Sequence, residues 1–206
     1  MSTIATKDSI NIRSELSKLK NQNRYGAGWQ DLIAPLNNSN APGLSPPNWT
    51  AMGSNGHYGL HFTAGESAFV TFHVTHDWAG CLSYPHIHFL VDIDMTVPGE
   101  TITWKLHYTI ARGHHQTESL TGIRETITLT YTTDGTETAG EHLILECSDA
   151  QAIDMLEVDS VIVMEVEMDA ASVTGTEKIY GLMADIHYES SGTLTNEKSP
   201  EFTKNV

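Results

Sequence analysis

Strict alternation of apolar and polar residues recurs along most of this chain and constrains its fold more than any other feature. In residues 86–94, for example, Ile87, Phe89, Val91 and Ile93 share one parity, and polar residues fill most of the other. A period of two is typical of a half-buried β-strand, because successive side chains point to opposite faces of a sheet. The pattern predicts eight strands: 57–63, 66–74, 86–94, 101–110, 123–132, 142–147, 160–168 and 179–189.

No long helical period interrupts these segments, and the loops between them are too short for the crossovers that parallel strands need. A length of 206 residues suits one sizeable core. Only 18% of the residues are charged, and Thr, Ser and Gly are abundant, as expected for short strands joined by polar turns. We therefore predict an all-β, jelly-roll-like antiparallel β-sandwich, with a lipocalin-like barrel as the structural alternative.

The regions outside the alternating segments predict additional organisation. Ile12, Leu16 and Leu19 recur at helical spacing within a basic stretch, which indicates a short helical arm that could dock on a partner. A segment rich in Pro, Gly, Asn and Ser follows and indicates an extended strap. The predicted organisation is a basic helical arm at 1–24, a strap or linker at 25–56, the β-sandwich at 57–190 and a tail at 191–206.

The charge distribution excludes some partners. The formal net charge is -15, and the arm is the only basic part, so the acidic body should repel nucleic acid. No 18-residue apolar run and no signal peptide are present, so we expect no membrane insertion. Cys81 and Cys147 form no zinc or redox motif, which fits a protein made in a cytoplasm.

The stretch YPHIHF at 84–89 places His86 and His88 on the polar face of a strand, opposite Ile87 and Phe89. Two imidazoles side by side can bind one metal ion, and no other cofactor is expected. In jelly-roll order, the first, third, sixth and eighth predicted strands share a sheet. That order would gather five histidines on one polar surface: His61, His86, His88, His142 and His187.

Several interpretations of these histidines remain open. In a monomer, a metal at His86 and His88 would take further ligands from His187, His61, His142 or Asp92; in a trimer, three copies of the pair could meet on the axis. Alternatively, the histidines decorate a subunit interface. A cupin-like metalloenzyme is a further alternative, but a cupin site faces into the barrel. No nucleophile elbow or phosphate loop is present, and the protein is predicted not to be an enzyme.

A third class of function is carbohydrate recognition. The loop THDWAGCLSYP at 75–85 contains Trp78 and Tyr84, and aromatic rings on a β-sandwich can stack against sugars. This reading makes Trp78 and Tyr84 a recognition loop for a host surface glycan. The competing interpretation is that Trp78 anchors the loop by packing.

Four motifs in order resemble a family of bacteriophage and prophage proteins of about this length. They are WQDLIAPL at 29–36, YPHIHFLVD at 84–92, TWKLHYTIA at 103–111 and GLMADIHYE at 181–189. The sequence departs from the family pattern at Tyr84, where the family has His, and at Phe89, where it has Trp. A function that needs three histidines in this motif is therefore in doubt.

The resemblance implies a virion structural protein of the tail, neck, collar, fibre or capsid surface. By analogy with phage fibres and spikes, it would be a homo-oligomer, with a trimer favoured. The expected partners are other virion proteins, with the basic arm docking on an acidic portal, neck, tail or capsid surface. The expected location is the virion, after assembly in the host cytoplasm.

Overall fold

The computed structural model describes residues 27–36, 45–54, 56–113, 122–154, 157–173 and 179–191. The predicted arm at 1–24, with Ile12, Leu16 and Leu19, lies outside the described residues, as does nearly all of the predicted tail. Docking through the arm therefore stays a prediction. Among the described residues, no helix is long and apolar enough to cross a membrane.

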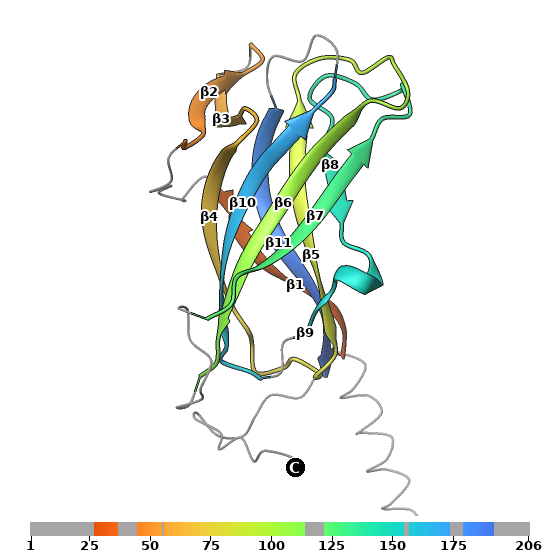
Figure 1. Ribbon diagram of the computed structural model, residues 1–206. Helices are drawn as coiled ribbons and strands as arrows, with labels where there is room; N and C mark the ends of the chain where they lie inside the picture. The colour runs from red at the N-terminus through yellow and green to blue at the C-terminus, as the bar shows by residue number, and fades with distance from the viewer. Residues whose placement is uncertain are drawn as a thin grey trace, which may run out of the picture.

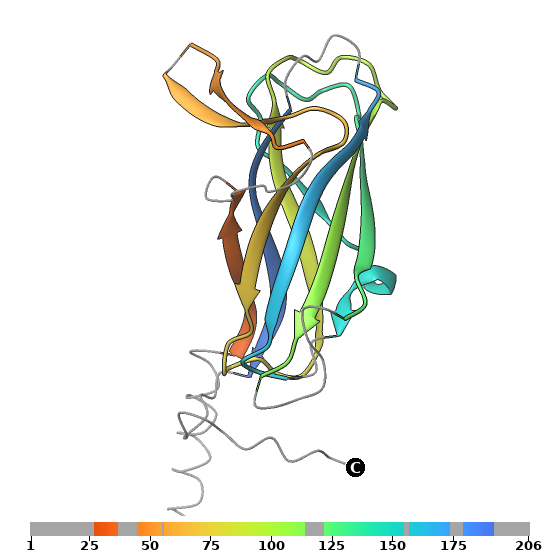
Figure 2. The ribbon, with the colours of Figure 1, turned by 60° about the vertical axis from the view of Figure 1, so that its left-hand side comes forward.

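The described chain forms two antiparallel sheets that face each other (Figure 1; Figure 2). The four-stranded sheet has the order β4 (Glu66–His73), β10 (Val161–Ala171), β6 (Thr101–Ala111) and β7 (Glu125–Thr132). The seven-stranded sheet has the order β2 (Asn48–Met52), β3 (His57–Phe62), β11 (Ile179–Ser191), β5 (Leu82–Val91) and β8 (Leu143–Glu146). Two further strands complete it, because β1 (Ala27–Pro35) pairs with β11 and β9 (Ile153–Asp154) pairs with β5.

The prediction of an all-β antiparallel sandwich is confirmed. The first, third, sixth and eighth predicted strands correspond to β3, β5, β8 and β11, and these share one sheet, as the jelly-roll order requires. Residues 25–56 are not a continuous strap, because β1 and β2 lie within this range. The alternation in β1 is short, and turn-forming residues follow it directly. The sequence pattern therefore indicates a strap where the structure has a strand.

The core lies between the sheets, on the faces that alternation predicts. Trp104 of β6 is fully buried, with its ring centroid 5.2 Å from that of Phe62 and 5.8 Å from that of Phe89. Ile87 and Phe89 are fully buried as well. The opposite parity of β5, including His86 and His88, therefore lies on the outer face of the seven-stranded sheet.

A β-bulge in β11 adjusts the face on which its last residues lie. Gly181 pairs with Phe89 and Met183 pairs with His88, so Leu182 is an extra residue in this strand. Alternation alone places Leu182 on the core face with Ala184, but Gly181 occupies that face instead. A Cβ at Gly181 would lie 2.7 Å from Phe62 and 2.8 Å from Leu36, so only glycine fits there.

Candidate functional site

Four adjacent strands, with the residue that precedes β8, bring seven ionisable side chains together on the outer face of the seven-stranded sheet. Asp185 of β11 pairs with His86 of β5, which pairs in turn with Glu146 of β8. On the other side of β11, Asp31 of β1 pairs with His187. We call the whole set the histidine–carboxylate cluster: Asp31, His86, His88, His142, Glu146, Asp185 and His187.

His86 is the buried centre of the cluster, with 1% of its surface exposed. Its Nε2 lies 3.4 Å from Oε1 of Glu146, and its Nδ1 lies 3.0 Å from Oδ1 of Asp185. Burial by itself would lower the pKa of this imidazole, but the adjacent Asp185 and Glu146 carboxylates outweigh it and raise the pKa. The surroundings of His86 therefore favour the protonated, cationic form of its imidazole.

Asp185 is a buried carboxylate that contacts two imidazoles. Its Oδ2 lies 3.0 Å from Nε2 of His88, in addition to its contact with His86. Burial raises the pKa of Asp185, but the adjacent imidazoles of His86 and His88 outweigh burial and hold this pKa well below its usual range. Asp185 is therefore an anionic anchor for both histidines of the HIH motif.

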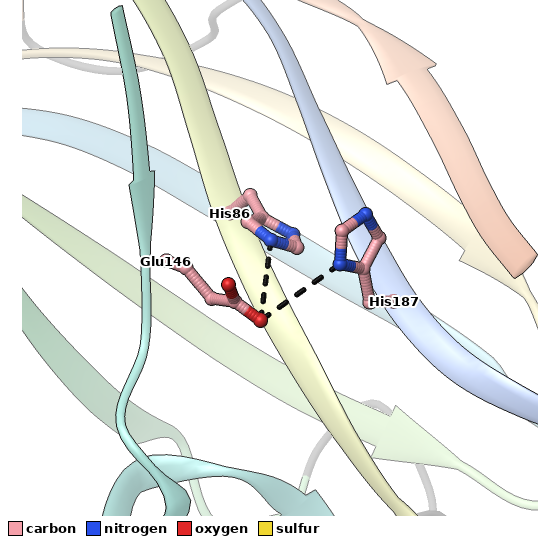
Figure 3. Close-up of side chains that lie close together, drawn as sticks. All are labelled: His86, Glu146 and His187. Carbon is pink, nitrogen blue, oxygen red and sulfur yellow. Dashed lines mark ion pairs between the residues drawn. The ribbon is translucent and has the colours of Figure 1, made fainter. Parts of the chain in front are cut away.

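His187 faces His86 across the two strands. Their ring centroids are 3.7 Å apart in an edge-to-face arrangement. Nε2 of His187 lies 2.6 Å from Oδ1 of Asp31, and its Nδ1 lies 3.8 Å from Oε1 of Glu146. Figure 3 shows His86 and His187 on neighbouring strands, with Glu146 reaching toward both rings.

The two histidines of the HIH motif have different partners. His86 approaches Glu146 and His187, whereas Nδ1 of His88 lies 2.8 Å from Nε2 of His142. The ring centroids of His86 and His88 are 6.2 Å apart. A site on a threefold axis would need both rings at the surface, and the burial of His86 within its own chain does not fit such a site.

The remaining predicted histidine lies elsewhere on the same face. His61 neighbours Tyr180, with ring centroids 6.0 Å apart, and it takes no part in the cluster contacts described above. Asp31 and Glu146 were not among the predicted ligands. The alternation in 142–147 places Glu146 on the same outer face as His142 and Ile144, and this signal could have identified Glu146 as a ligand. Asp31 gave no such signal, because it lies in the segment interpreted as a strap.

The predicted recognition aromatics have different environments. The indole Nε1 of Trp78 donates a hydrogen bond to the carbonyl of Cys81 at 3.2 Å, and its ring packs against the core, so Trp78 anchors the loop. Tyr84 also packs against the core, but its strand position places it on the outer face, where Trp29 of β1 packs edge-to-face against it with ring centroids 5.6 Å apart. Trp29 is 62% exposed, so this ring gives the outer face an accessible aromatic surface beside the histidine–carboxylate cluster.

A small pocket lies further along the same face, beyond His88. Its volume is about 280 Å³, and its lining includes Met52, His57, Leu90, Asp92, Gly140 and Tyr180. Oδ1 of Asp92 is buried and has no hydrogen-bond partner among the described residues. A buried acceptor of this kind normally finds a donor, but solvent does not reach this oxygen, so a ligand hydroxyl would bond to it only after the Asp92 side chain rotates.

Comparisons with known proteins identify no family. No protein-family model matches the chain, and no curated protein matches its sequence. Among solved structures, the xylan-binding module CBM15 is similar over 78% of this chain and 97% of its own, at 13% identity and a TM-score of 0.41. The CBM36-1 domain of a multidomain xylanase from the hindgut metagenome of Trinervitermes trinervoides is similar over 77% and 96%, at 9% identity and a TM-score of 0.40. At these scores the likenesses carry no conclusion about function.

Proposed function

We propose that this protein is a non-catalytic carbohydrate-binding protein that holds a glycan along the outer face of its seven-stranded sheet. The observation that carries the proposal is the combination, on one sheet face, of an exposed tryptophan platform and a pocket lined by Asp92 and Tyr180. A sugar presents both chemistries that such a face recognises: an apolar C–H surface for the aromatic ring and hydroxyl donors for the carboxylate.

The spacing of these two features favours a chain of several sugars over a single one. Leu90 lines the pocket and Tyr84 supports Trp29, and both belong to β5. Six strand residues span about 20 Å at the usual rise per residue. Between the two ends lie the polar side chains of the histidine–carboxylate cluster, which could accept or donate hydrogen bonds along the glycan.

The charge of the face favours neutral glycans over acidic ones. Asp31, Glu146 and Asp92 all lie on this face, and within the described residues the ionic partners of Asp31 and Glu146 are imidazoles. Carboxylates repel the uronic and sialic acids of acidic glycans, and the formal net charge of -15 adds to that repulsion. We therefore expect uncharged polysaccharides as the ligand class.

A glycan array followed by calorimetry tests the proposal. We expect the protein to bind at least one neutral glycan and Trp29→Ala and Asp92→Ala to weaken binding at least tenfold. Trp49→Ala is the matched control, because Trp49 is 53% exposed but lies on β2, away from the Trp29–Tyr84 pair. Equal binding by Trp29→Ala and Trp49→Ala, or no glycan bound by the wild type, would refute the proposal.

A place in a bacteriophage particle is a second proposal, supported by the resemblance of the four motifs. A glycan-binding surface suits a virion component, since a particle must first contact the host surface. Mass spectrometry of purified particles should detect the protein, and deletion of residues 1–24 should remove it from particles while the sandwich still folds.

Sedimentation of the purified protein tests the expected trimer. Normal incorporation of the truncated protein would contradict docking through the arm.

A further inference from the structure

We propose that Nε2 of His86, Nδ1 of His187 and Oε1 of Glu146 bind one divalent transition-metal ion per chain, with zinc as the best match. The inference is independent of glycan binding. It concerns three residues of the histidine–carboxylate cluster that come from β5, β8 and β11, and Figure 3 shows them converging on one point.

The separations of the three ligand atoms suit a tetrahedral ion. Oε1 of Glu146 lies 3.4 Å from Nε2 of His86 and 3.8 Å from Nδ1 of His187, and all three atoms lie within 4.8 Å of one another. Zinc bonds of about 2.0–2.2 Å in tetrahedral geometry hold their ligand atoms about 3.3–3.5 Å apart. The two separations from Glu146 are therefore close to those that a tetrahedral zinc ion requires.

The second nitrogen of each imidazole is already held by a carboxylate. Nδ1 of His86 lies 3.0 Å from Asp185, and Nε2 of His187 lies 2.6 Å from Asp31. A proton on each of these nitrogens would leave a lone pair on the opposite nitrogen, which lies 3.4 Å from Oε1 of Glu146 in His86 and 3.8 Å from it in His187. Metal-binding histidines are held by carboxylates in this way, which fixes both the tautomer and the ring orientation.

The charge balance of the cluster also calls for a cation. Asp31, Glu146 and Asp185 carry three negative charges when ionised, and within the described chain their ion pairs are formed with histidines rather than lysine or arginine. Two of the four imidazoles, His86 and His88, are largely buried. A divalent ion would offset two of these three charges without requiring protonated imidazoles.

The ligand types select the metal, and the exposure of two ligands leaves room for a further one. Two imidazoles and one carboxylate suit zinc and its transition-metal neighbours, whereas calcium and magnesium prefer oxygen ligands. The Glu146 side chain is 51% exposed and that of His187 is 36% exposed, so the remaining position faces solvent. A water molecule or an oxygen of a bound ligand would complete the coordination.

The test uses untagged full-length protein stripped with a chelator and titrated with zinc chloride by calorimetry. We expect one zinc per chain, and a cobalt-loaded sample should show the intense visible absorption of tetrahedral cobalt. Glu146→Gln and His187→Ala should each weaken zinc binding at least 100-fold. These two positions are partly exposed, and circular dichroism verifies that both variants fold.

Two further variants separate positioning from ligation. Asp31→Asn should weaken zinc binding about 10–100-fold at unchanged stoichiometry, because Asp31 orients His187 without contacting the metal. His107→Ala is the control: His107 lies on the outer face of the other sheet, with Thr126 and Glu167 as partners, and its loss should leave zinc binding unchanged.

Several results would overturn the metal site. They are no zinc bound, one zinc per three chains, stronger binding of calcium than of zinc, or wild-type affinity in Glu146→Gln and His187→Ala. Because the titration contains no glycan, its failure leaves the glycan proposal standing. Conversely, a glycan array probed in excess chelator tests glycan binding without the metal.

Discussion

The outer faces of the two sheets differ in how their carboxylates are neutralised. On the four-stranded sheet, Glu165 pairs with Arg124, and Asp169 lies 2.5 Å from Nζ of Lys105. On the seven-stranded sheet, Asp31, Glu146 and Asp185 contact only imidazoles among their ion pairs within the described residues. The first face carries permanent cations beside its Glu167–His107 pair, whereas the carboxylates of the cluster on the second face are paired with groups whose charge depends on a proton or a metal.

This difference separates a structural role from a binding role. Exposed pairs such as Lys105–Asp169 keep a solvated face soluble and contribute little to stability. A buried carboxylate shared by two imidazoles, as at Asp185, costs free energy to desolvate and is stable only while its partners remain in place. The seven-stranded face is thus the one on which single changes should have large effects.

Asp185→Ala should produce the largest effect. The change leaves Nδ1 of His86 without its carboxylate partner in a buried position, and breaking a buried pair of this kind costs about 3–5 kcal/mol. Urea denaturation measures the free energy of unfolding. A loss below about 1 kcal/mol would mean that the cluster is no more coupled than the opposite face.

Zinc should stabilise the protein through the seven-stranded face alone. At a free zinc concentration of 100 times Kd, the free energy of unfolding should rise by about 2.7 kcal/mol. Thermal melts with and without zinc provide the measurement. The increase should vanish in Glu146→Gln and persist in His107→Ala; an increase that persists in both would place the metal elsewhere.

The pH dependence of stability in metal-free protein should also come from the seven-stranded face. The raised pKa of His86 contributes stability below about pH 6.5 that is lost as the pH rises through its folded-state pKa. The lowered pKa of Asp185 contributes stability above about pH 3.9 that is lost as the pH falls through its folded-state pKa. The pair therefore stabilises the fold most between about pH 4 and 6.5.

Denaturation at a series of pH values measures this window. Asp185→Asn should reduce both the loss of stability at low pH and the loss at high pH. Lys105→Met is the control, because the hydrogen bond to Asp169 raises the pKa of Lys105 and keeps it charged throughout. The control should keep the wild-type profile between about pH 3 and 9. If Asp185→Asn kept the wild-type dependence of stability on pH, the cluster would not be the source of that dependence.

Glu167→Gln on the four-stranded face should have a small effect. Glu167 accepts a hydrogen bond from His107, whose other ring nitrogen contacts Thr126, so the imidazole keeps one partner. We expect a loss of about 1 kcal/mol in urea denaturation. A loss that matches that of Asp185→Ala would abolish the contrast between the two faces.

Trp29→Ala should have the smallest effect on stability despite its expected effect on glycan binding. The exposed ring loses its contact with Tyr84 and little else, so we expect a change within about 1 kcal/mol. Trp104→Ala, in the core, should cost about 3–5 kcal/mol by comparison. A destabilised Trp29→Ala protein would turn any loss of glycan binding into a folding effect.

Much of this contrast could be predicted from the chain. The eight alternating segments correspond to eight observed strands, and the parity of 86–94 correctly assigns His86 and His88 to the outer face. The jelly-roll order also anticipates that β5, β8 and β11 are neighbours. Asp31 and Trp29 could not be found in this way, because β1 was interpreted as a strap and its partner β11 is far away in the chain.

Alternation is a local property, and by itself it determined the eight alternating segments that form strands and the outward faces of most of their side chains. The tertiary structure decided the rest: the pairing of β1 with β11, the bulge at Gly181, and the partner of each ring nitrogen. Such contacts join residues far apart in the chain, and they depend on register and side-chain rotation. A shift of one residue in a single strand would turn Glu146 or Asp31 away from the histidines, and alternation cannot specify that register.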